Sequence, residues 1–350
     1  MSFNKYLPLI WTLFSAFIFK SDKPYLFPQL RHFPSMPVSK ENPVTVKGAE
    51  LGRYLFYDPI LSKEKNISCA SCHNQKLAFS DSSNHQSHGA GYKTRNTLPL
   101  FNLAWYSAYF WDGRAFTLEE QISHPLKDPA EMNISMDEIV SRLNQNTFYK
   151  IRFKETFGIQ KIDSVAIVKA LGQFLRTLIS NNSKFDKVLA GKAVLSREEF
   201  EGLELMNDMT KGDCLHCHTT DADVLGTTRG FSNNGLDNIQ IADDYTDKGL
   251  GAITGKNRDS GKFKIPSLRN VGLTSPYMHD GRFRTLEEVL DFYSEGVNVC
   301  VNIDSKMTMA HQKGVKLSKK EKKNIIAFLH TLTDSVFISN PKYANPFKIK

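Results

Sequence analysis

The chain has 350 residues, of which 41% are hydrophobic and 23% charged, and its formal net charge is +8. This composition excludes a disordered, a collagenous and a multi-spanning membrane protein. At about 100–200 residues per domain, the length predicts two domains. The positive charge is scattered, which argues against nucleic acid as a partner. Its one dense run, Lys319, Lys320, Lys322 and Lys323, is typical of a solvated helix face.

Residues 1–20 have the pattern of a targeting segment. Lys5 precedes an apolar stretch from Leu7 to Phe19, and Lys20 closes it. This stretch is shorter than the about 20 residues that a membrane-spanning helix needs, whereas a positive start and a short apolar core are typical of a secretory signal. No clear small-residue cleavage site follows, so an uncleaved N-terminal membrane anchor stays an alternative.

Four of the five cysteines form two short motifs of the same type. They are Cys69-Ala-Ser-Cys72-His73 and Cys214-Leu-His-Cys217-His218. Each is C-x-x-C-H, the attachment signature of c-type haem. Two thiols at this spacing reach the two vinyl groups of one porphyrin, and the adjacent imidazole lies under the iron.

A redox dithiol and a zinc site are the rival interpretations of these motifs. Zinc needs four clustered ligands, but the two pairs are far apart in the sequence, and neither rival explains a histidine at the same place twice. We therefore expect two covalently attached haem c groups. Haem attachment takes place outside the cytoplasm, so together with the targeting segment it predicts a periplasmic protein. The fifth cysteine, Cys300, has the character of a small buried hydrophobe.

A ten-residue segment occurs twice in the chain. Trp111–Glu120 matches His279–Glu288 at seven of ten positions, and the same offset pairs Asn102 with Asn270. Each copy follows its own C-x-x-C-H motif. The chain is therefore interpreted as two copies of one haem domain.

The remaining local patterns are helical. Capping boxes predict helix starts after Thr117, Ser196, Thr285 and Ser318, and apolar residues between Val165 and Leu178 recur at helical spacing. Gly296 stands where a C-cap glycine would end a helix over Leu286–Glu295. No long alternating strand pattern is present. The sequence predicts a mainly α fold of two tandem cytochrome c-like haem domains with long loops, such as residues 226–263.

The expected boundaries follow from these segments. We predict a signal peptide or anchor over residues 1–20, a Pro-rich linker over 21–43, an N-terminal haem domain over 44–190, a C-terminal haem domain over 191–335, and a tail over 336–350.

The two copies differ fourteen residues after the aligned Trp111 and His279. The second copy has Tyr293 there, and the first has Pro125. Tyrosine can ligate haem iron and proline cannot. If this helix faces the iron, the second haem is closed and suits electron transfer, whereas the first is open and can bind a small molecule. Two alternatives stay open: Tyr293 is an ordinary core aromatic, or Met307 is the ligand instead.

From about Pro43 to Asp334 the chain resembles the bacterial dihaem cytochrome c peroxidases and the related MauG-type enzymes. The resemblance is carried by both C-x-x-C-H motifs and by several linked segments. These segments are Thr94-Arg95-Asn96, Phe110-Trp111-Asp112-Gly113-Arg114, Asp128-Pro129-Ala130-Glu131-Met132, Pro266-Ser267-Leu268-Arg269-Asn270 and Leu273-Thr274-Ser275-Pro276-Tyr277-Met278-His279-Asp280-Gly281.

The resemblance implies a division of labour between the haems. The N-terminal haem would react with hydrogen peroxide, and the C-terminal haem would accept electrons from a small cytochrome c or cupredoxin. Trp111 would lie between them as the electron relay, and Gln121 and Glu131 would flank the open iron. A carboxylate within reach can move a proton between the two peroxide oxygens, so Glu131 is the expected acid–base group, with Gln121 positioning peroxide or water.

Further ligands are implied in the same way. In many of the peroxidases a histidine at the place of His88 caps the first iron in the resting state. Tyr293 departs from the methionine of well-studied peroxidases and is similar to the MauG group. A calcium ion between the domains would be bound by the side-chain oxygen of Asn96 and by the carbonyls of Thr274 and Pro276, since calcium prefers oxygen ligands.

The sequence therefore predicts a dihaem peroxidase that reduces hydrogen peroxide to water with electrons from a small periplasmic redox protein. One alternative is a MauG-like enzyme that oxidises a protein side chain through a high-valent haem. A second is a dihaem electron-transfer cytochrome without catalysis. A homodimer stays open.

Overall fold

The computed structural model describes residues 23–348 except 31, 38, 83–94 and 220–225. The predicted targeting segment and His88 lie outside the described residues. The mainly helical prediction is confirmed, since the only strands in the described part are β1, Phe231–Ser232, and β2, Phe263–Lys264. They pair antiparallel, with Phe231 opposite Lys264. No helix in this part is both long enough and apolar enough to cross a bilayer.

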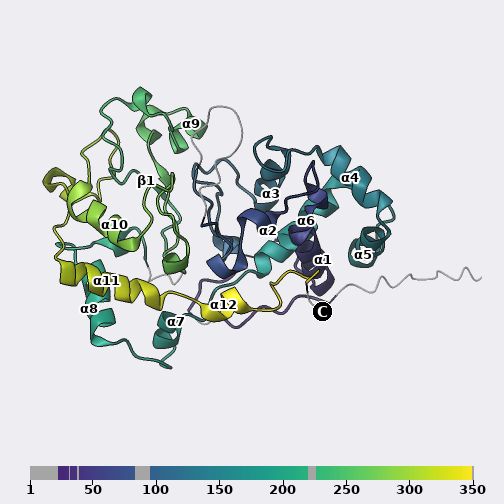
Figure 1. Ribbon diagram of the computed structural model, residues 1–350, viewed down its shortest axis with the longest axis horizontal. Coiled ribbons are helices and arrows are strands. Elements are labelled where there is room, and N and C mark those ends of the chain that lie inside the picture. The colour runs from purple at the N-terminus through teal and green to yellow at the C-terminus, as the bar shows by residue number, and fades with distance from the viewer. Residues whose placement is uncertain (1–22, 31, 38, 83–94, 220–225, 349–350) are drawn as a thin grey trace, which may run out of the picture.

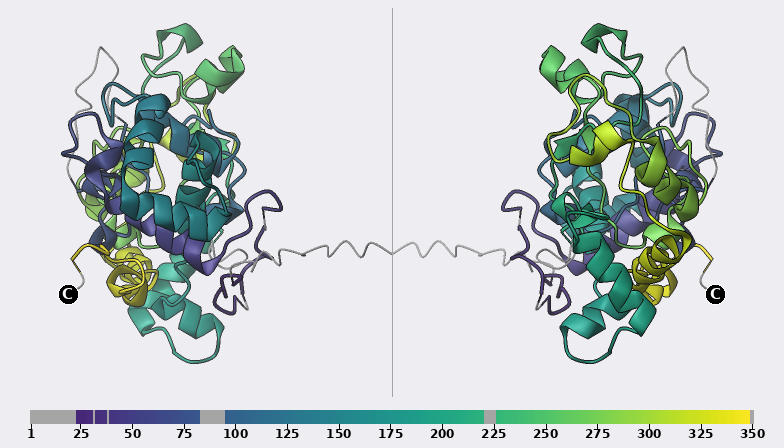
Figure 2. Two further views of the ribbon diagram at one scale, coloured as in Figure 1. Left: turned by 90° about the vertical axis from the view of Figure 1, so that its right-hand side faces the viewer. Right: turned by 90° about the vertical axis from the view of Figure 1, so that its left-hand side faces the viewer.

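The helices fall into two groups that occupy the two ends of the molecule (Figure 1). The first group is α1 (Val46–Tyr57), α2 (Cys69–Cys72), α3 (Leu118–Lys127), α4 (Met136–Gln145), α5 (Thr147–Phe157) and α6 (Ser164–Thr177). The second is α7 (Lys184–Leu189), α8 (Arg197–Asn207), α9 (Leu250–Thr254), α10 (Leu286–Asp291) and α11 (Lys319–Thr331). Two separate apolar clusters form their cores, and the loop that carries α9 projects at one edge in every view (Figure 2).

The last helix returns to the first domain. α12, Ser335–Ser339, runs beneath the N-terminal group (Figure 1). Phe337 and Tyr343 are buried in the core of that domain. The end of the described chain thus packs across the domain junction.

The capping signals placed the helix starts correctly. The hydroxyl groups of Thr117, Ser196, Thr285 and Ser318 each accept a hydrogen bond from the backbone three residues on, and α3, α8, α10 and α11 begin at the next residue. The helix does end at Gly296 as predicted, but not through a left-handed C-cap. α10 continues into a π-helical turn, Phe292–Gly296, and Gly296 is the last residue of that turn rather than a left-handed residue beyond it.

Each domain is built around one close crossing of its first and last long helices, α1 with α6 and α8 with α11. A β-carbon added to Gly52 would lie 2.0 Å from the carbonyl oxygen of Ala170, and one added to Gly202 would lie 2.0 Å from that of Asn324. The aromatic residues Phe174 and Phe328 pack beside the two glycines. The two domains therefore share one architecture, as the sequence repeat predicted.

This crossing yields a stability prediction. We expect Gly202→Ala to lower the free energy of unfolding by about 1–3 kcal/mol, the usual cost of overpacking, because backbone of α11 blocks the added methyl group. Gly230→Ala is the control, since its nearest neighbour would be 3.6 Å away. Thermal unfolding followed by circular dichroism measures both. Equal unfolding temperatures for the two variants would contradict the assigned crossing.

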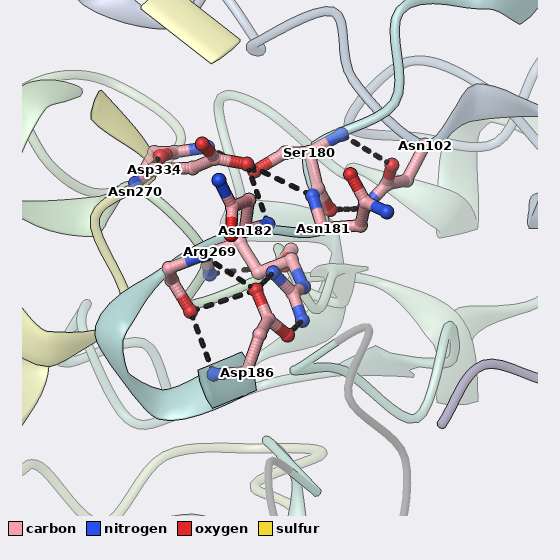
Figure 3. A network of polar contacts seen from close by, with 10 residues as sticks. Asn102, Ser180, Asn181, Asn182, Asp186, Arg269, Asn270 and Asp334 are labelled. Atoms are coloured by element: carbon pink, nitrogen blue, oxygen red, sulfur yellow. Dashed lines mark hydrogen bonds and ion pairs between the residues drawn. The ribbon is translucent and has the colours of Figure 1, made fainter. Parts of the chain in front are cut away.

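The two repeats interlock at the domain junction through a polar network (Figure 3). Asn102 and Asn270 are both left-handed, with φ of 54° and 56°. Their side-chain oxygens accept hydrogen bonds from equivalent backbone amides, those of Ser180 at 3.0 Å and Asp334 at 2.8 Å. The network crosses between the copies, because the Asn270 amide donates to the Ser180 hydroxyl at 3.1 Å and that hydroxyl donates to Asp334 at 3.2 Å. These bonds join the two repeats at the domain junction.

Candidate haem sites and the interface between them

The first C-x-x-C-H motif is folded to present a histidine nitrogen. α2 holds Cys69 and Cys72 one turn apart, and His73 ends it. Ala78 and Phe79 adopt left-handed conformations, with φ of 53° and 58°, and turn the chain back so that the Phe79 carbonyl lies 2.8 Å from Nδ1 of His73. A carbonyl can only accept, so Nδ1 carries the proton and Nε2 keeps its lone pair for a metal. Burial lowers the pKa of His73, which favours this neutral form.

The second motif repeats the arrangement with a different carbonyl. Cys214 begins a short 3₁₀ turn, Cys214–His216, and Nδ1 of His218 lies 3.0 Å from the Pro266 carbonyl oxygen. Burial lowers the pKa of His218 to about 4, so this ring is also neutral. Two free thiols and a neutral histidine with a bare Nε2 are what haem c attachment requires, and both motifs meet this test.

Glu131 lies beside the first motif. Gln121 and Pro125 are four residues apart on α3 and share one face. The turn after α3 folds back on it, because the Met132 amide donates to the Pro125 carbonyl at 3.1 Å. The charge of Glu131 contributes to raising the pKa of both Cys69 and Cys72, although burial is the main cause. The structure therefore brings the predicted acid–base group to the haem site that has proline in place of tyrosine.

The surroundings of Glu131 favour a protonated carboxyl group more than water does. Burial raises its pKa, Asp128 raises it further, and Arg114 opposes both. The side chain is nevertheless exposed, so its surroundings are crowded but open to solvent. Arg114 is held over the Phe110 ring, 3.5 Å from its centroid, which fixes a positive charge close to this carboxylate.

Tyr293 lies at the second motif. It belongs to the π-helical turn after α10, and its hydroxyl oxygen accepts a hydrogen bond from the Asn234 amide at 2.9 Å. Burial raises the pKa of Tyr293 to about 12, and the charges of Cys214 and Cys217 add to that rise. Because those are the haem-attachment thiols, the tyrosine is close to where this haem binds.

Met307 packs in the same small apolar cluster as Tyr293. The structure thus brings both predicted sixth ligands to one place. Met278 joins this cluster, and its sulfur lies 3.7 Å from the Asn234 amide. Neither Asn234 nor Met278 was a predicted site residue, although Met278 stands directly before His279 in the repeated segment.

Trp111 lies at the interface between the domains and is only 7% exposed. Its indole N–H donates to the Asn96 carbonyl at 2.7 Å, and its own carbonyl accepts from the amide of Lys264 in β2 at 2.8 Å. Asn96 is bound in turn to the second domain, since its backbone N–H donates to the His279 carbonyl at 2.7 Å. Trp111 is therefore held by both domains, through its indole by Asn96 and through its carbonyl by Lys264.

A partly buried charge network reinforces this interface. Arg95 binds Asp247 of the second domain through two hydrogen bonds, of 2.8 and 2.7 Å, and Asp112 of the first at 2.6 Å. Asp112 also binds Arg114 at 3.0 Å. The network thus extends from the cation beside Glu131 to the second domain.

Two of the three predicted calcium ligands, Asn96 and Pro276, are in contact. The side-chain nitrogen of Asn96 donates to the carbonyl of Pro276 and lies 3.4 Å from that of Met278, so the nitrogen, rather than the oxygen that calcium would need, faces these carbonyls. Thr274 stands two residues before Pro276. Amide and carbonyl oxygens are the donor type that calcium takes. No group of three or more histidine, cysteine or acidic side chains suited to a metal occurs among the described residues.

Comparison with known proteins identifies similar chains. Residues 46–194 match the family described as "Di-haem cytochrome c peroxidase". The chain is 36% identical to the methylamine utilization protein MauG of Methylorubrum extorquens, over 87% of this chain and 83% of that protein. It is 35% identical to the cytochrome c551 peroxidase of Nitrosomonas europaea, over 86% and 84%. A solved MauG-like protein associated with microbial copper homeostasis superposes with a TM-score of 0.84 at 33% identity, covering 93% of this chain and all of that one.

Proposed function

Because this chain belongs to the family of di-haem cytochrome c peroxidases and MauG proteins, we propose that it reduces hydrogen peroxide to water with electrons from a small periplasmic redox protein. The observation that carries the proposal is the difference between the two sites. Glu131 lies at the first C-x-x-C-H motif, and Pro125 on α3 would offer an iron there no ligand. Tyr293 occupies the equivalent place at the second.

The protein's own residues have separate tasks in this proposal. When bound, haem supplies an iron that takes up peroxide at the first site and passes electrons at the second. His73 and His218 would each offer Nε2 to a haem iron, since their Nδ1 atoms are bound to carbonyls. Glu131 accepts the proton of the near peroxide oxygen and delivers it to the leaving oxygen, and Gln121 orients peroxide or water. Trp111 would connect the two sites, and His88, which lies outside the described residues, would bind the first iron in the resting protein.

Calcium has a positioning task in the same proposal. Asn96, Thr274 and Pro276 would bind the ion with oxygen atoms from both domains. Asn96 also accepts the indole hydrogen bond of Trp111, so an ion bound here would steady the relay.

A test of this function uses the holo-protein with the C-terminal haem reduced. We expect peroxide-dependent oxidation of a reduced small cytochrome c or cupredoxin, two electrons per peroxide, followed by donor absorbance. Omitting peroxide is the control. The proposal fails if no reduced small donor is oxidised, even after this pre-reduction.

Tyr293 favours a second candidate function. Its place beside Cys214 and Cys217 is similar to the MauG group, so the protein would oxidise a side chain of a partner protein. Peroxide consumption without a reduced donor, together with covalent change in a partner protein, would support this candidate over the first.

A further inference from the structure

Lys264 contacts the relay segment at two points. Its backbone amide donates to the Trp111 carbonyl at 2.8 Å. Its side chain then reaches into the first domain, where Nζ donates to the Ala108 carbonyl at 2.9 Å and lies 4.1 Å from the centre of the Tyr106 ring. Lys264, in β2 of the second domain, therefore contacts residues 106–111 of the first domain near both ends of that segment.

The side chain of Lys264 is buried, unlike that of a typical surface lysine. Lys264 is 7% exposed, and burial, with a smaller contribution from Arg229, lowers its pKa to about 7. Burying an ammonium group costs free energy unless the group is paired or hydrogen-bonded, and here the Ala108 carbonyl and the Tyr106 ring face it. Both the ammonium and the neutral amine can donate to Ala108, so the contact persists in either form.

The segment that follows Lys264 also reaches the second haem site. Two residues further on, the Pro266 carbonyl accepts the Nδ1 proton of His218 at 3.0 Å. One short segment, Lys264–Pro266, is thus hydrogen-bonded to Trp111 at one end and to the proximal histidine of the second haem at the other. Its placement therefore links the position of Trp111 to that of His218.

We propose that Lys264 is a positioning residue for electron transfer: its side-chain contacts with Ala108 and Tyr106 hold Trp111 in the orientation that connects the two haem sites. This rests on the relay role of Trp111 in the proposed function. Without the side chain, the backbone bond to Trp111 remains, but the segment before the indole loses its anchor to the second domain.

The test compares Lys264→Met with the wild-type holo-protein. Pulse radiolysis delivers one electron to the fully oxidised protein, and absorbance follows its redistribution between the two haems, without peroxide. We expect Lys264→Met to slow this redistribution by about tenfold or more, because misplacing a positioned group can cost up to about 10²-fold. Lys264→Arg, which keeps a long donor, should recover part of the rate. Lys262→Met is the matched control, since that lysine forms a partly exposed ion pair with Asp259 at 3.1 Å.

Haem content and the unfolding temperature separate this role from a merely structural one. A Lys264→Met protein that is less stable but redistributes the electron at the wild-type rate overturns the proposal. Trp111→Phe distinguishes failure of the positioning role of Lys264 from failure of the relay role of Trp111. If it slows transfer and Lys264→Met does not, only the role of Lys264 fails. If neither slows transfer, the relay fails and the positioning role fails with it. Because peroxide takes no part, absence of peroxidase activity leaves this measurement unaffected.

Discussion

Glu131→Gln is expected to slow peroxide cleavage by about 10²-fold or more, the usual scale for loss of a general acid–base group. Glutamine has nearly the same shape as glutamate but cannot accept and return a proton. Both haems should stay attached, and peroxide should still reach the first site, because the substitution leaves the α3 turn and its backbone bonds unchanged. Stopped-flow absorbance of the half-reduced protein mixed with peroxide measures the rate.

The pH dependence gives this prediction a second readout. Glu131 must be ionised to accept the peroxide proton, and burial and Asp128 raise its pKa. The wild-type rate should therefore fall as the pH drops through this raised pKa, at a higher pH than for an ordinary glutamate. The Gln variant should lose that dependence. Glu50→Gln, the same change at an exposed carboxyl group of α1, should leave rate and pH profile unchanged. An unchanged rate in Glu131→Gln would remove this residue from the mechanism.

The sequence predicted those features that depend on local chemistry. Capping boxes depend on residues three positions apart, so the starts of α8, α10 and α11 could be read directly. The C-x-x-C-H motifs are likewise local. Gly296 shows the limit of this approach: it does end the helix, but the sequence does not reveal that the last turn widens into a π-helix.

Features formed by distant segments could not be predicted. Lys264 meets Ala108 across 156 positions of sequence, and Asn234 meets Tyr293 across 59, with no periodicity to signal either contact. Glu131 was assigned only from the resemblance of its segment to the peroxidase family, because a single carboxylate in a loop forms no sequence pattern. Its place at Cys69 and Cys72 depends on the turn that folds back on α3.

The second large effect is expected for Tyr293→Phe. This change removes only the oxygen that faces the Asn234 amide, so packing should survive. If Tyr293 is the sixth ligand, the C-terminal haem loses it and changes spin state, and the N-terminal spectrum stays the same. The reduction potential of the C-terminal haem should rise by on the order of 0.1 V, within the roughly 0.8 V that axial ligands span. EPR of the oxidised protein and a redox titration measure these changes.

Met307→Leu is the matched comparison, because Met307 packs in the same cluster as Tyr293. If Met307 is the ligand, this variant loses the methionine-to-iron band near the red edge of the ferric spectrum, and Tyr293→Phe does little. The hydrogen bond from Asn234 favours the tyrosine. An amide that donates to the phenol oxygen stabilises the phenolate, and the phenolate is the form that binds ferric iron. If neither variant alters the C-terminal haem, the fourteen-residue register between Pro125 and Tyr293 is wrong as a guide to the iron, and Met278 becomes the candidate in this cluster.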